Sequence, residues 1–303
     1  MTIKQVNINV FMNKLIGSNS RIEGSDVLFE AGRRLSEKKK IIRSKPVISI
    51  ITVVKNNDQY LEETIKSVLN QTYNQIEYII VDGGSKDNSL DIIKKYSDQI
   101  DYAVSQTDES LWDAINKGLS LVTGDLIGIV NSDDTLRPNA LEILCKYYLN
   151  NPNADFFFGS VKKHWGILHG YRAWKIKFSW FFYSSHSTGF YIKKEAAEKV
   201  GKYSLKYKYS SDFDYFYRMI VHQKLNGIAT KKNEIFGDFR SGGISSYVDF
   251  WEHFYEKNKI RIDNKQNKIF LFVLIILKVI YNFKKLRSFK FKEFQIFIKQ
   301  NFF

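Results

Sequence analysis

Two acidic segments carry residue types that could do chemistry. In the first, Asp133 and Asp134 end the loop 131–134, directly after the apolar run 126–130. Adjacent carboxylates at the end of a buried strand repel each other and lose hydration, so a counter-ion is expected. Mg²⁺ or Mn²⁺ accepts such oxygen ligands, usually together with substrate phosphates. The same residues also suit a turn in which Asp134 caps the next helix, and the local sequence leaves both interpretations open.

The second acidic segment, 210–218, combines acids with aromatic residues. Phe213, Phe216 and Tyr217 share one side of a predicted helix, which marks that side as buried. Asp212 lies in the opening turn, where the helix dipole favours a carboxylate. The segment therefore either holds an acid toward a cleft or simply begins a helix with one.

Alternating strands and helices must position these acids. Continuous apolar runs predict buried strands, and apolar residues at helical spacing predict helices. The predicted strands are 47–54, 77–81, 102–105, 126–130 and 156–158, and the helices between them include 58–69, 90–96 and 111–121. Right-handed crossovers of this kind build an open, mostly parallel α/β sheet that binds ligands beyond the carboxyl ends of its strands.

Composition limits the class of protein. With 303 residues, 44% hydrophobic and 26% charged, the chain is neither disordered nor a polytopic membrane protein. A net charge of +14 favours anionic partners, whether nucleic acid, an acidic membrane surface or phosphorylated substrates. The single cysteine, Cys145, is predicted to be buried in a helix and indicates a reducing cytoplasm. The apolar stretch 10–12 is too short for a signal peptide, so export is not expected.

Changes in composition and periodicity along the chain predict three segments: a basic arm (1–45), an α/β domain (46–250) and a basic, amphipathic helical segment (251–303). Within the last, the stretch 269–283 has an apolar core of roughly fifteen residues, against about 20 needed to span a bilayer. Because basic residues follow it, a helix lying in the interface of an anionic membrane fits best. A helix packed on the domain and a true span are the alternatives.

Five motifs in order resemble a family 2 glycosyltransferase of the GT-A fold, similar to bacterial enzymes that build surface polysaccharides. The resemblance covers roughly residues 46–245. The motifs are the strand 47–52 with Asn56, the segment 67–73, the Asp-Gly-Gly-Ser loop within 80–87, the Asp-Ala-Ile-Asn-Lys-Gly segment 113–118, and the Asn-Ser-Asp-Asp loop 131–134. It implies that 46–160 is the nucleotide-binding half of the domain and 161–250 the acceptor half.

The resemblance also implies roles for the residues at the strand ends. Thr52 and Val54 would lie along the nucleotide base, and Asp82 would accept a hydrogen bond from the base. Asp133 would approach the ribose, and Asp134 would bind the Mg²⁺ or Mn²⁺ that bridges the diphosphate. Two positions depart from the family pattern. Gly83 stands where members of the family often have a second Asp, and Asn131 stands where many have the outer Asp of the metal motif.

In the family, an acid six residues before an arginine is the general base, and Asp212 has that spacing to Arg218. Asp214 is the second candidate.

Four further residues would border the pockets for donor and acceptor, and we expect contacts there from Trp112, Asp113, His186 and Arg240. Arg240 precedes a Gly-rich loop that is predicted to close over the diphosphate.

The predicted function is inverting transfer of a sugar from a nucleotide diphosphate sugar, expected to be a UDP-sugar, to a glycan or lipid-linked acceptor of cell-surface polysaccharide biosynthesis. The predicted location is the inner face of the cell membrane, with peripheral attachment to its anionic surface and no nucleic-acid partner. A sugar nucleotidyltransferase is the rival enzyme, but it would carry a Gly-rich basic loop where residues 53–58 stand. A non-catalytic basic adaptor for membrane or nucleic acid is the rival from another class.

Overall fold

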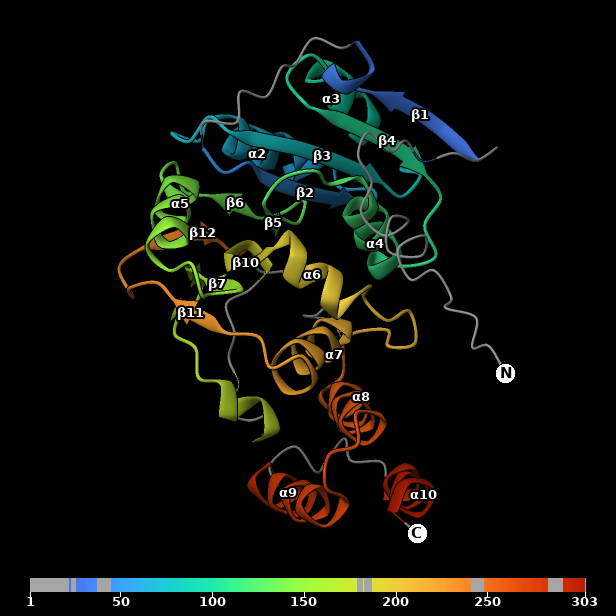
Figure 1. Cartoon of the computed structure of the whole chain (residues 1–303). Helices are drawn as coiled ribbons and strands as arrows, with labels where there is room; N and C mark the ends of the chain where they lie inside the picture. Colours follow the sequence, from blue (N-terminus) through green and yellow to red (C-terminus); the bar gives the residue numbers. More distant parts are fainter. Residues whose placement is uncertain are drawn as a thin grey trace, which may run out of the picture. The chain divides into compact units, whose positions relative to one another are not determined.

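The computed structural model describes residues 22, 26–36, 45–178, 182, 187–240, 248–282 and 291–302 (Figure 1). It divides into two compact units, which are described separately. Unit 1 comprises Met1–Tyr171, Tyr183–Tyr203 and Leu225–Ser241, and unit 2 comprises Arg172–Phe182, Ser204–Lys224 and Gly242–Phe303. The predicted acceptor half, 161–250, is therefore shared between the two units.

Unit 1 is built on an eight-stranded sheet. In spatial order its strands are β1 (Val27–Ala31), β4 (Tyr102–Gln106), β3 (Ile76–Asp82), β2 (Ile48–Val54), β5 (Leu126–Ile129), β10 (Phe190–Lys193), β7 (Phe156–Phe158) and β11 (Gly227–Ala229). The central strands β4, β3, β2 and β5 are parallel, whereas β10 runs antiparallel to β5 and β7. The sequence prediction of a mostly parallel α/β sheet is confirmed.

The two middle strands show why the sheet forms. All seven residues of β2 are buried, as are six of the seven in β3, because helices leave neither face of these strands open to water. Their parallel register pairs Ile48 with Ile76 and Val54 with Asp82, so both strands end at the same edge of the sheet. That edge carries the loops that follow Val54 and Asp82.

Helices connect the strands of unit 1: α2 (Asp58–Leu69), α3 (Ser89–Lys95), α4 (Leu111–Leu121), α5 (Ala140–Asn150) and α6 (Lys194–Val200). The helix predicted from Asp58 begins there, although Asn57 rather than Asp58 occupies the N-cap position. Residues of α2 and α5, among them Leu61, Leu141 and Cys145, join the strands in one hydrophobic core. Cys145 is buried and free, as its place on the helix predicted.

A smaller sheet in unit 1 was not predicted. Its strands, in spatial order, are β6 (Thr135–Leu136), β12 (Ile235–Asp238), β8 (Ser160–Lys163) and β9 (Gly166–Leu168). β6 begins directly after Asp134, and β12 pairs with it through Asp238 and Thr135. This pairing brings the chain near residue 240 to the acidic loop 131–134.

The predicted basic arm contains ordered structure. Strand β1 pairs antiparallel with β4 and is followed by the short 3₁₀ helix η1 (Arg33–Ser36). Two basic residues of η1 form ion pairs, Arg33 with Asp101 at 3.2 Å and Arg34 with Glu77 at 2.8 Å. Residues 27–36 of the predicted basic arm are therefore attached to the sheet, because buried carboxylates hold two of their cations.

Unit 2 is helical. It contains η2 (Ala173–Phe178), α7 (Ser211–Tyr217), a π-helical turn η4 (Arg218–His222), α8 (Phe250–Asp263), α9 (Lys268–Tyr281) and α10 (Phe291–Phe302). A second hydrophobic cluster joins Trp251 and Phe254 of α8 to Leu271 and Ile275 of α9. Within the described ranges, no helix is both long enough and apolar enough to cross a membrane.

Candidate active site

The acidic loop after β5 contains one buried and one accessible carboxylate. Asp134 is fully buried. Its carboxylate accepts hydrogen bonds from Thr188 Oγ1 (3.0 Å), the backbone amide of Arg240 (3.2 Å) and Asn131 Nδ2 (3.4 Å). Burial raises the pKa of Asp134 to about 7, and the neighbouring Asp133 adds to that rise. Asp134 therefore links three segments of unit 1 from inside the protein.

Asp133 lies beside a cavity of about 620 Å³ that runs along α2 and is also lined by Arg240, Lys66 and Arg137. Its side chain is partly exposed. Burial raises the pKa of Asp133, and the charge of Arg240 opposes the rise. Of the two acids, Asp133 is the one that a ligand can reach. Asp134, to which the resemblance assigns the metal, is the buried member of the pair.

The fit to a divalent metal ion depends on few protein atoms. Within the described ranges, no group of three or more His, Cys, Asp or Glu side chains could hold a metal ion. Asn131 donates through Nδ2 to Ser187 Oγ (3.1 Å), which directs its carbonyl Oδ1 away from that bond. One accessible carboxylate with one amide oxygen suits Mg²⁺ or Mn²⁺ only when substrate phosphates or water supply the other ligands.

Arg240 is held against the acidic loop. Its Nε donates to the carbonyl of Asp133 (3.2 Å), and its Nη2 pairs with Glu63 of α2 at 2.6 Å. The guanidinium also lies over the ring of Tyr60, 4.1 Å from the centroid. These contacts fix a positive charge next to Asp133. The predicted loop that follows, 241–247, lies outside the described residues, as does His186.

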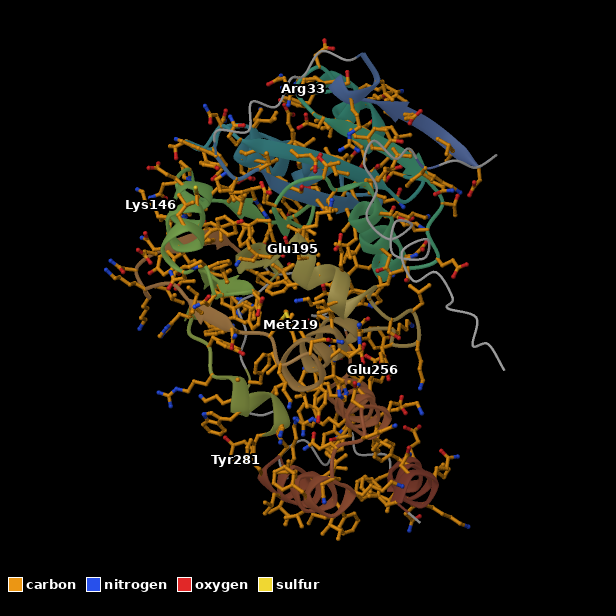
Figure 2. All side chains as sticks on the ribbon, viewed as in Figure 1. Arg33, Lys146, Glu195, Met219, Glu256 and Tyr281 are labelled. Carbon is orange, nitrogen blue, oxygen red and sulfur yellow. The ribbon has the colours of Figure 1, made fainter. Side chains whose placement is uncertain are left out.

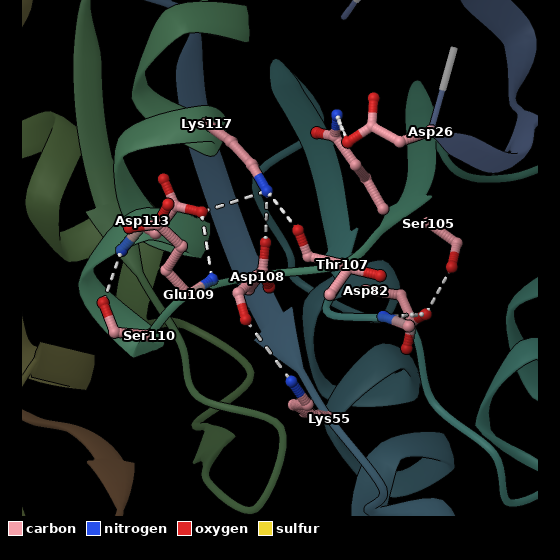
Figure 3. A network of polar contacts seen from close by, with 12 residues as sticks. Asp26, Lys55, Asp82, Ser105, Thr107, Asp108, Glu109, Ser110, Asp113 and Lys117 are labelled. Atoms are coloured by element: carbon pink, nitrogen blue, oxygen red, sulfur yellow. Dashed lines mark hydrogen bonds and ion pairs between the residues drawn. The ribbon is translucent and has the colours of Figure 1, made fainter. Parts of the chain in front are cut away.

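At the end of β3, Asp82 is fully buried, and its two carboxylate oxygens differ in their hydrogen bonds. Its Oδ2 accepts three hydrogen bonds, from the amides of Gly84 and Ser85 (both 3.0 Å) and from Ser105 Oγ (2.6 Å). Figure 3 shows the bond with Ser105. Its Oδ1 is buried without a hydrogen-bond partner among the described residues. A buried acceptor without a donor costs stability, so it is usually completed by a bound molecule.

The side chains at the end of the first strand, β2, are buried. Thr52 is fully buried, and its hydroxyl lies 3.1 Å from that of Tyr78. Val54 packs in the hydrophobic core. Neither side chain is accessible, because the strand is buried on both faces. A contact between this strand and a ligand is restricted to the backbone at its end.

The carboxylate of Asp108, in the loop between β4 and α4, fills the space beside Gly83. A Cβ atom on Gly83 would stand 2.6 Å from Asp108 Oδ2, so a side chain at position 83 is excluded unless Asp108 moves. Lys117 Nζ bonds Asp108 Oδ1 (2.7 Å) and pairs with Asp113 at 3.1 Å (Figure 3). The side chain of Lys55 is the other neighbour of Gly83, 3.2 Å from the same Cβ position.

Asp108 is a candidate that the sequence reasoning missed. Burial raises its pKa, and the charge of Lys117 opposes the rise. Two features of the sequence are related to Asp108. Gly83 has no side chain and so leaves space beside it, and the i,i+4 spacing of Asp113 and Lys117 places a lysine near this segment. Only the fold shows that Asp108 occupies the space left by that glycine.

The two predicted donor-pocket residues on α4 lie side by side in the sequence but in different surroundings. Trp112 is 7% exposed and stacks on Tyr203, with ring centroids 5.7 Å apart. Asp113 remains partly exposed beside Lys117. Asp113 is therefore the accessible member, and Trp112 supports the helix from behind.

The second acidic segment, in unit 2, also separates its two acids. Asp214 is buried and pairs with Arg218 (2.8 Å) and Asn264 Nδ2 (2.9 Å). Asp212 is exposed, and its Oδ1 accepts a hydrogen bond from the amide of the next residue, Phe213 (2.7 Å). The surrounding bulk of protein raises the pKa of Asp212, whereas the charge of Lys257 lowers it. The arginine of the predicted motif thus serves Asp214, and Asp212 faces solvent.

The family model described as glycosyl transferase family 2 matches residues 49–212, more than half of the chain. The chain belongs to glycosyl transferase family 2. The recognition made from five sequence motifs is thereby confirmed.

Sequence relatives of this family 2 enzyme come from distant organisms. An uncharacterized glycosyltransferase of Methanocaldococcus jannaschii is 29% identical over 59% of this chain and 66% of its own length. Another, of Rickettsia prowazekii, is 26% identical over 70% of this chain and 72% of its own. Glycosyltransferase GlyG of Streptococcus pneumoniae is 32% identical, over 38% of each chain. The chain thus spans less than two thirds of several relatives that it matches.

Solved structures of other glycosyltransferases share its fold. The S. aureus TarS fragment 1–349 in complex with UDP-GlcNAc superposes with a TM-score of 0.60 at 15% identity, covering 76% of this chain and 70% of that one. A mannosyltransferase from Pyrobaculum calidifontis, in complex with GDP-Man and Mn²⁺, gives 0.56 at 16% identity over 74% and 66%. These similarities confirm the predicted GT-A architecture of the glycosyltransferase.

Proposed function

We propose that this family 2 glycosyltransferase moves a sugar from a nucleotide diphosphate sugar to a hydroxyl group, with inversion at the anomeric carbon. The observation that carries the donor assignment is Asp82 Oδ1, a buried carboxylate oxygen at the carboxyl edge of the sheet for which the described part of the chain supplies no donor. Ligands of open α/β sheets bind at this edge. A ring N–H of a nucleobase is the kind of donor that would complete it.

The chemistry of Asp82 limits the base. A carboxylate accepts hydrogen bonds but donates none, and we propose that its partner is a ring N–H rather than the exocyclic amine of adenine or cytosine. Uracil, thymine and guanine have one, whereas neutral adenine and cytosine do not. UDP-sugars are our first expectation, and the solved relatives hold UDP-GlcNAc and GDP-Man. Asp108, beside Gly83, would add a second acceptor for the ribose hydroxyls.

Asp133 and Arg240 support the place of the diphosphate. Arg240 donates to the Asp133 carbonyl, and the Asp133 carboxylate is accessible from the adjacent cavity. Mg²⁺ or Mn²⁺ held by Asp133, with Asn131 Oδ1 as a second candidate ligand, would neutralise the charge of the departing diphosphate. Arg240 supplies a fixed positive charge beside the same group.

Asp212 is the proposed general base. It is exposed at the start of α7, and its raised pKa brings it closer to neutrality, where proton transfer from a hydroxyl is more effective. The acceptor hydroxyl would give its proton to Asp212 and attack the anomeric carbon opposite the leaving diphosphate. A single displacement of this kind inverts the configuration. A glycan or lipid-linked acceptor of surface-polysaccharide synthesis is the proposed class.

A nucleotide-sugar panel tests this function. UDP-, GDP-, dTDP-, ADP- and CMP-sugars are offered with Mn²⁺, with Mg²⁺ or with chelator, and calorimetric binding and release of the nucleotide are measured. We expect binding only for the first three bases, enhanced by the ion and weakened in Asp82→Asn. Release of pyrophosphate from a nucleoside triphosphate and a sugar phosphate would instead indicate a nucleotidyltransferase. Equal binding of adenine and uracil nucleotides would overturn the role of Asp82.

A further inference from the structure

Helix α9 exposes a continuous apolar stripe. Along its 14 residues, exposed apolar side chains recur at helical spacing: Ile269, Phe270, Val273, Ile276, Leu277, Ile280 and Tyr281. Of the two lysines of the helix, Lys268 is exposed at its first position and Lys278 is partly buried. Ile269 is 79% exposed and Ile280 63%. The opposite side, with Leu271 and Ile275, packs against α8. Figure 2 labels Tyr281 at the end of this helix.

This stripe is unlike the other apolar residues of unit 2. The large apolar residues of α8 that face its neighbours, Trp251, Phe254 and Ile260, are almost fully buried. At about 1.5 Å per residue, α9 is about 21 Å long, so the stripe extends over that whole length. Exposed apolar side chains aligned in this way mark a surface that is covered by something else.

A second segment extends the stripe with aromatic and basic residues. Phe178 of η2 meets Phe270 of α9 edge to face, with centroids 5.4 Å apart, and Trp174 packs on Phe178 at 5.5 Å. Trp174 is 54% exposed. Aromatic rings of this kind are enriched where protein meets the headgroups of a bilayer. The sequence separates η2 from α9 by ninety residues, and the fold brings them together.

The position of η2 is fixed by buried polar contacts. Arg261 of α8 is 1% exposed and donates through Nη2 to the carbonyl of Ile176 (2.8 Å). Gln266 Nε2 donates to the carbonyl of Lys177 (2.9 Å). These bonds hold η2 beside the start of α9, so the aromatic and apolar residues form one surface, which we call the α9–η2 face.

Uncompensated positive charge borders this face. Arg172, Lys177 and Lys268 are exposed, and in the described part of the chain none of them forms an ion pair. The charge of the whole chain, +14, has the same sign. An apolar stripe bordered by cations matches the acyl and headgroup layers of an anionic membrane. A second copy of the chain would bring these same cations against each other.

We propose that the α9–η2 face docks on the surface of an anionic lipid bilayer, with α9 parallel to the membrane plane. Ile269, Val273, Ile276, Leu277 and Ile280 enter the acyl boundary. Trp174 and Tyr281 lie at the headgroup level, and Arg172, Lys177 and Lys268 contact anionic headgroups. This proposal does not depend on the proposed transfer reaction, since no residue of the donor site takes part.

Vesicle flotation with the full chain tests the apolar part. We expect wild type to float with vesicles of phosphatidylglycerol and phosphatidylcholine, and Leu277→Glu to lose at least tenfold in the bound fraction. Leu149→Glu is the matched control, because Leu149 is a similarly exposed leucine on α5 of unit 1. It should float as wild type does. Equal flotation of Leu277→Glu and Leu149→Glu would overturn the proposal.

The charged part has its own measurement. Each basic residue near an anionic surface contributes about fivefold in affinity, so Lys177→Gln and Lys268→Gln should each weaken binding by about that factor. The loss should disappear on vesicles of phosphatidylcholine alone. Light scattering on the same proteins identifies the other occupant. If wild type is a dimer that Leu277→Glu converts to a monomer, without change in flotation, a second copy covers the face and the proposal is wrong.

Discussion

The loop after β5, in unit 1, and the start of α7, in unit 2, each contain a pair of acids of which one is buried and the other accessible. Each has two acids close in sequence, Asp133 with Asp134 and Asp212 with Asp214. In each pair one carboxylate is buried and hydrogen-bonded, and the other is accessible with a raised pKa. A buried, hydrogen-bonded acid stabilises the local fold, whereas an accessible acid with a raised pKa can exchange protons or bind ions.

The two regions differ in what supports the buried member. Asp134 has neutral hydrogen-bond donors, Thr188 and a backbone amide among them, and its pKa rises to about 7. Asp214 has a full ion pair with Arg218. Adjacency in sequence does not reveal burial, so the sequence pattern alone does not show which acid of such a pair is accessible.

The largest expected effect concerns the accessible acid of α7. Asp212→Asn should lose about 10²- to 10⁴-fold in transfer rate, the usual contribution of a general base, while nucleotide affinity stays near wild type. Steady-state transfer and calorimetry measure the two. Asp214→Asn should instead lower the free energy of unfolding by about 1 to 3 kcal/mol, because Arg218 loses its partner. A near-normal transfer rate in Asp212→Asn would remove Asp212 as the base.

The next effect separates the acids after β5. Asp133→Asn should lose about 10- to 100-fold in metal-dependent nucleotide affinity. Asp134→Asn should retain most of it, since the new amide oxygen can accept from the backbone amide of Arg240 and the new amide nitrogen can donate to Thr188 Oγ1. Calorimetry with and without Mn²⁺ compares the two variants. The opposite ranking would restore Asp134 as the metal-binding residue.

A smaller effect is expected beside Gly83. Gly83→Ala places a methyl group against Asp108 Oδ2, and we expect about tenfold weaker nucleotide binding. Asp108→Ala should weaken binding by a similar factor. In the double variant the two losses should not add, because the displaced carboxylate is already gone. Additive losses would show that Asp108 does not act through this contact.

The smallest effect is a shift in pH dependence. In the proposed mechanism transfer requires deprotonated Asp212, so we expect the rate to fall as pH decreases through its pKa. The charge of Lys257 lowers that pKa, and Lys257→Met should therefore move the acidic limb of the rate profile to higher pH. Lys259→Met is the control, because this charge lowers the pKa of Asp263. An unmoved limb would mean that another group controls the profile.

Sequence reasoning went furthest where one local pattern determines one element. The strands around Val47–Val54 and 126–130 were predicted because continuous apolar runs have few alternatives in a soluble protein. The loops holding Asp82 and Asp133 followed, since parallel strands end at one edge of a sheet. The family and the fold class were both recoverable at this level.

What escaped prediction depends on contacts between distant segments. β1 is short and its outward face is partly exposed, so its sequence shows no strong period. The place of Asp108 beside Gly83, and that of η2 beside α9, depend on packing between segments 25 and about 90 residues apart. The accessibility of Thr52, Val54 and the four acids is likewise a property of the folded sheet and helices.

Arg34 has a consequence for where this protein can be cut. It pairs with Glu77, whose side chain is 3% exposed and also accepts hydrogen bonds from Ser49 and Thr123. The family match begins at residue 49, yet the cation for this carboxylate comes from residue 34. A chain trimmed to the family limits would keep the buried anion and lose its partner, at a cost of about 3 to 5 kcal/mol.

The same cut would remove β1 and leave β4, which stays paired with β3, as an edge strand whose outer backbone groups are unpaired, a template on which other chains can assemble. The part of this chain that matches the family is therefore shorter than the part that we expect to fold by itself without aggregating.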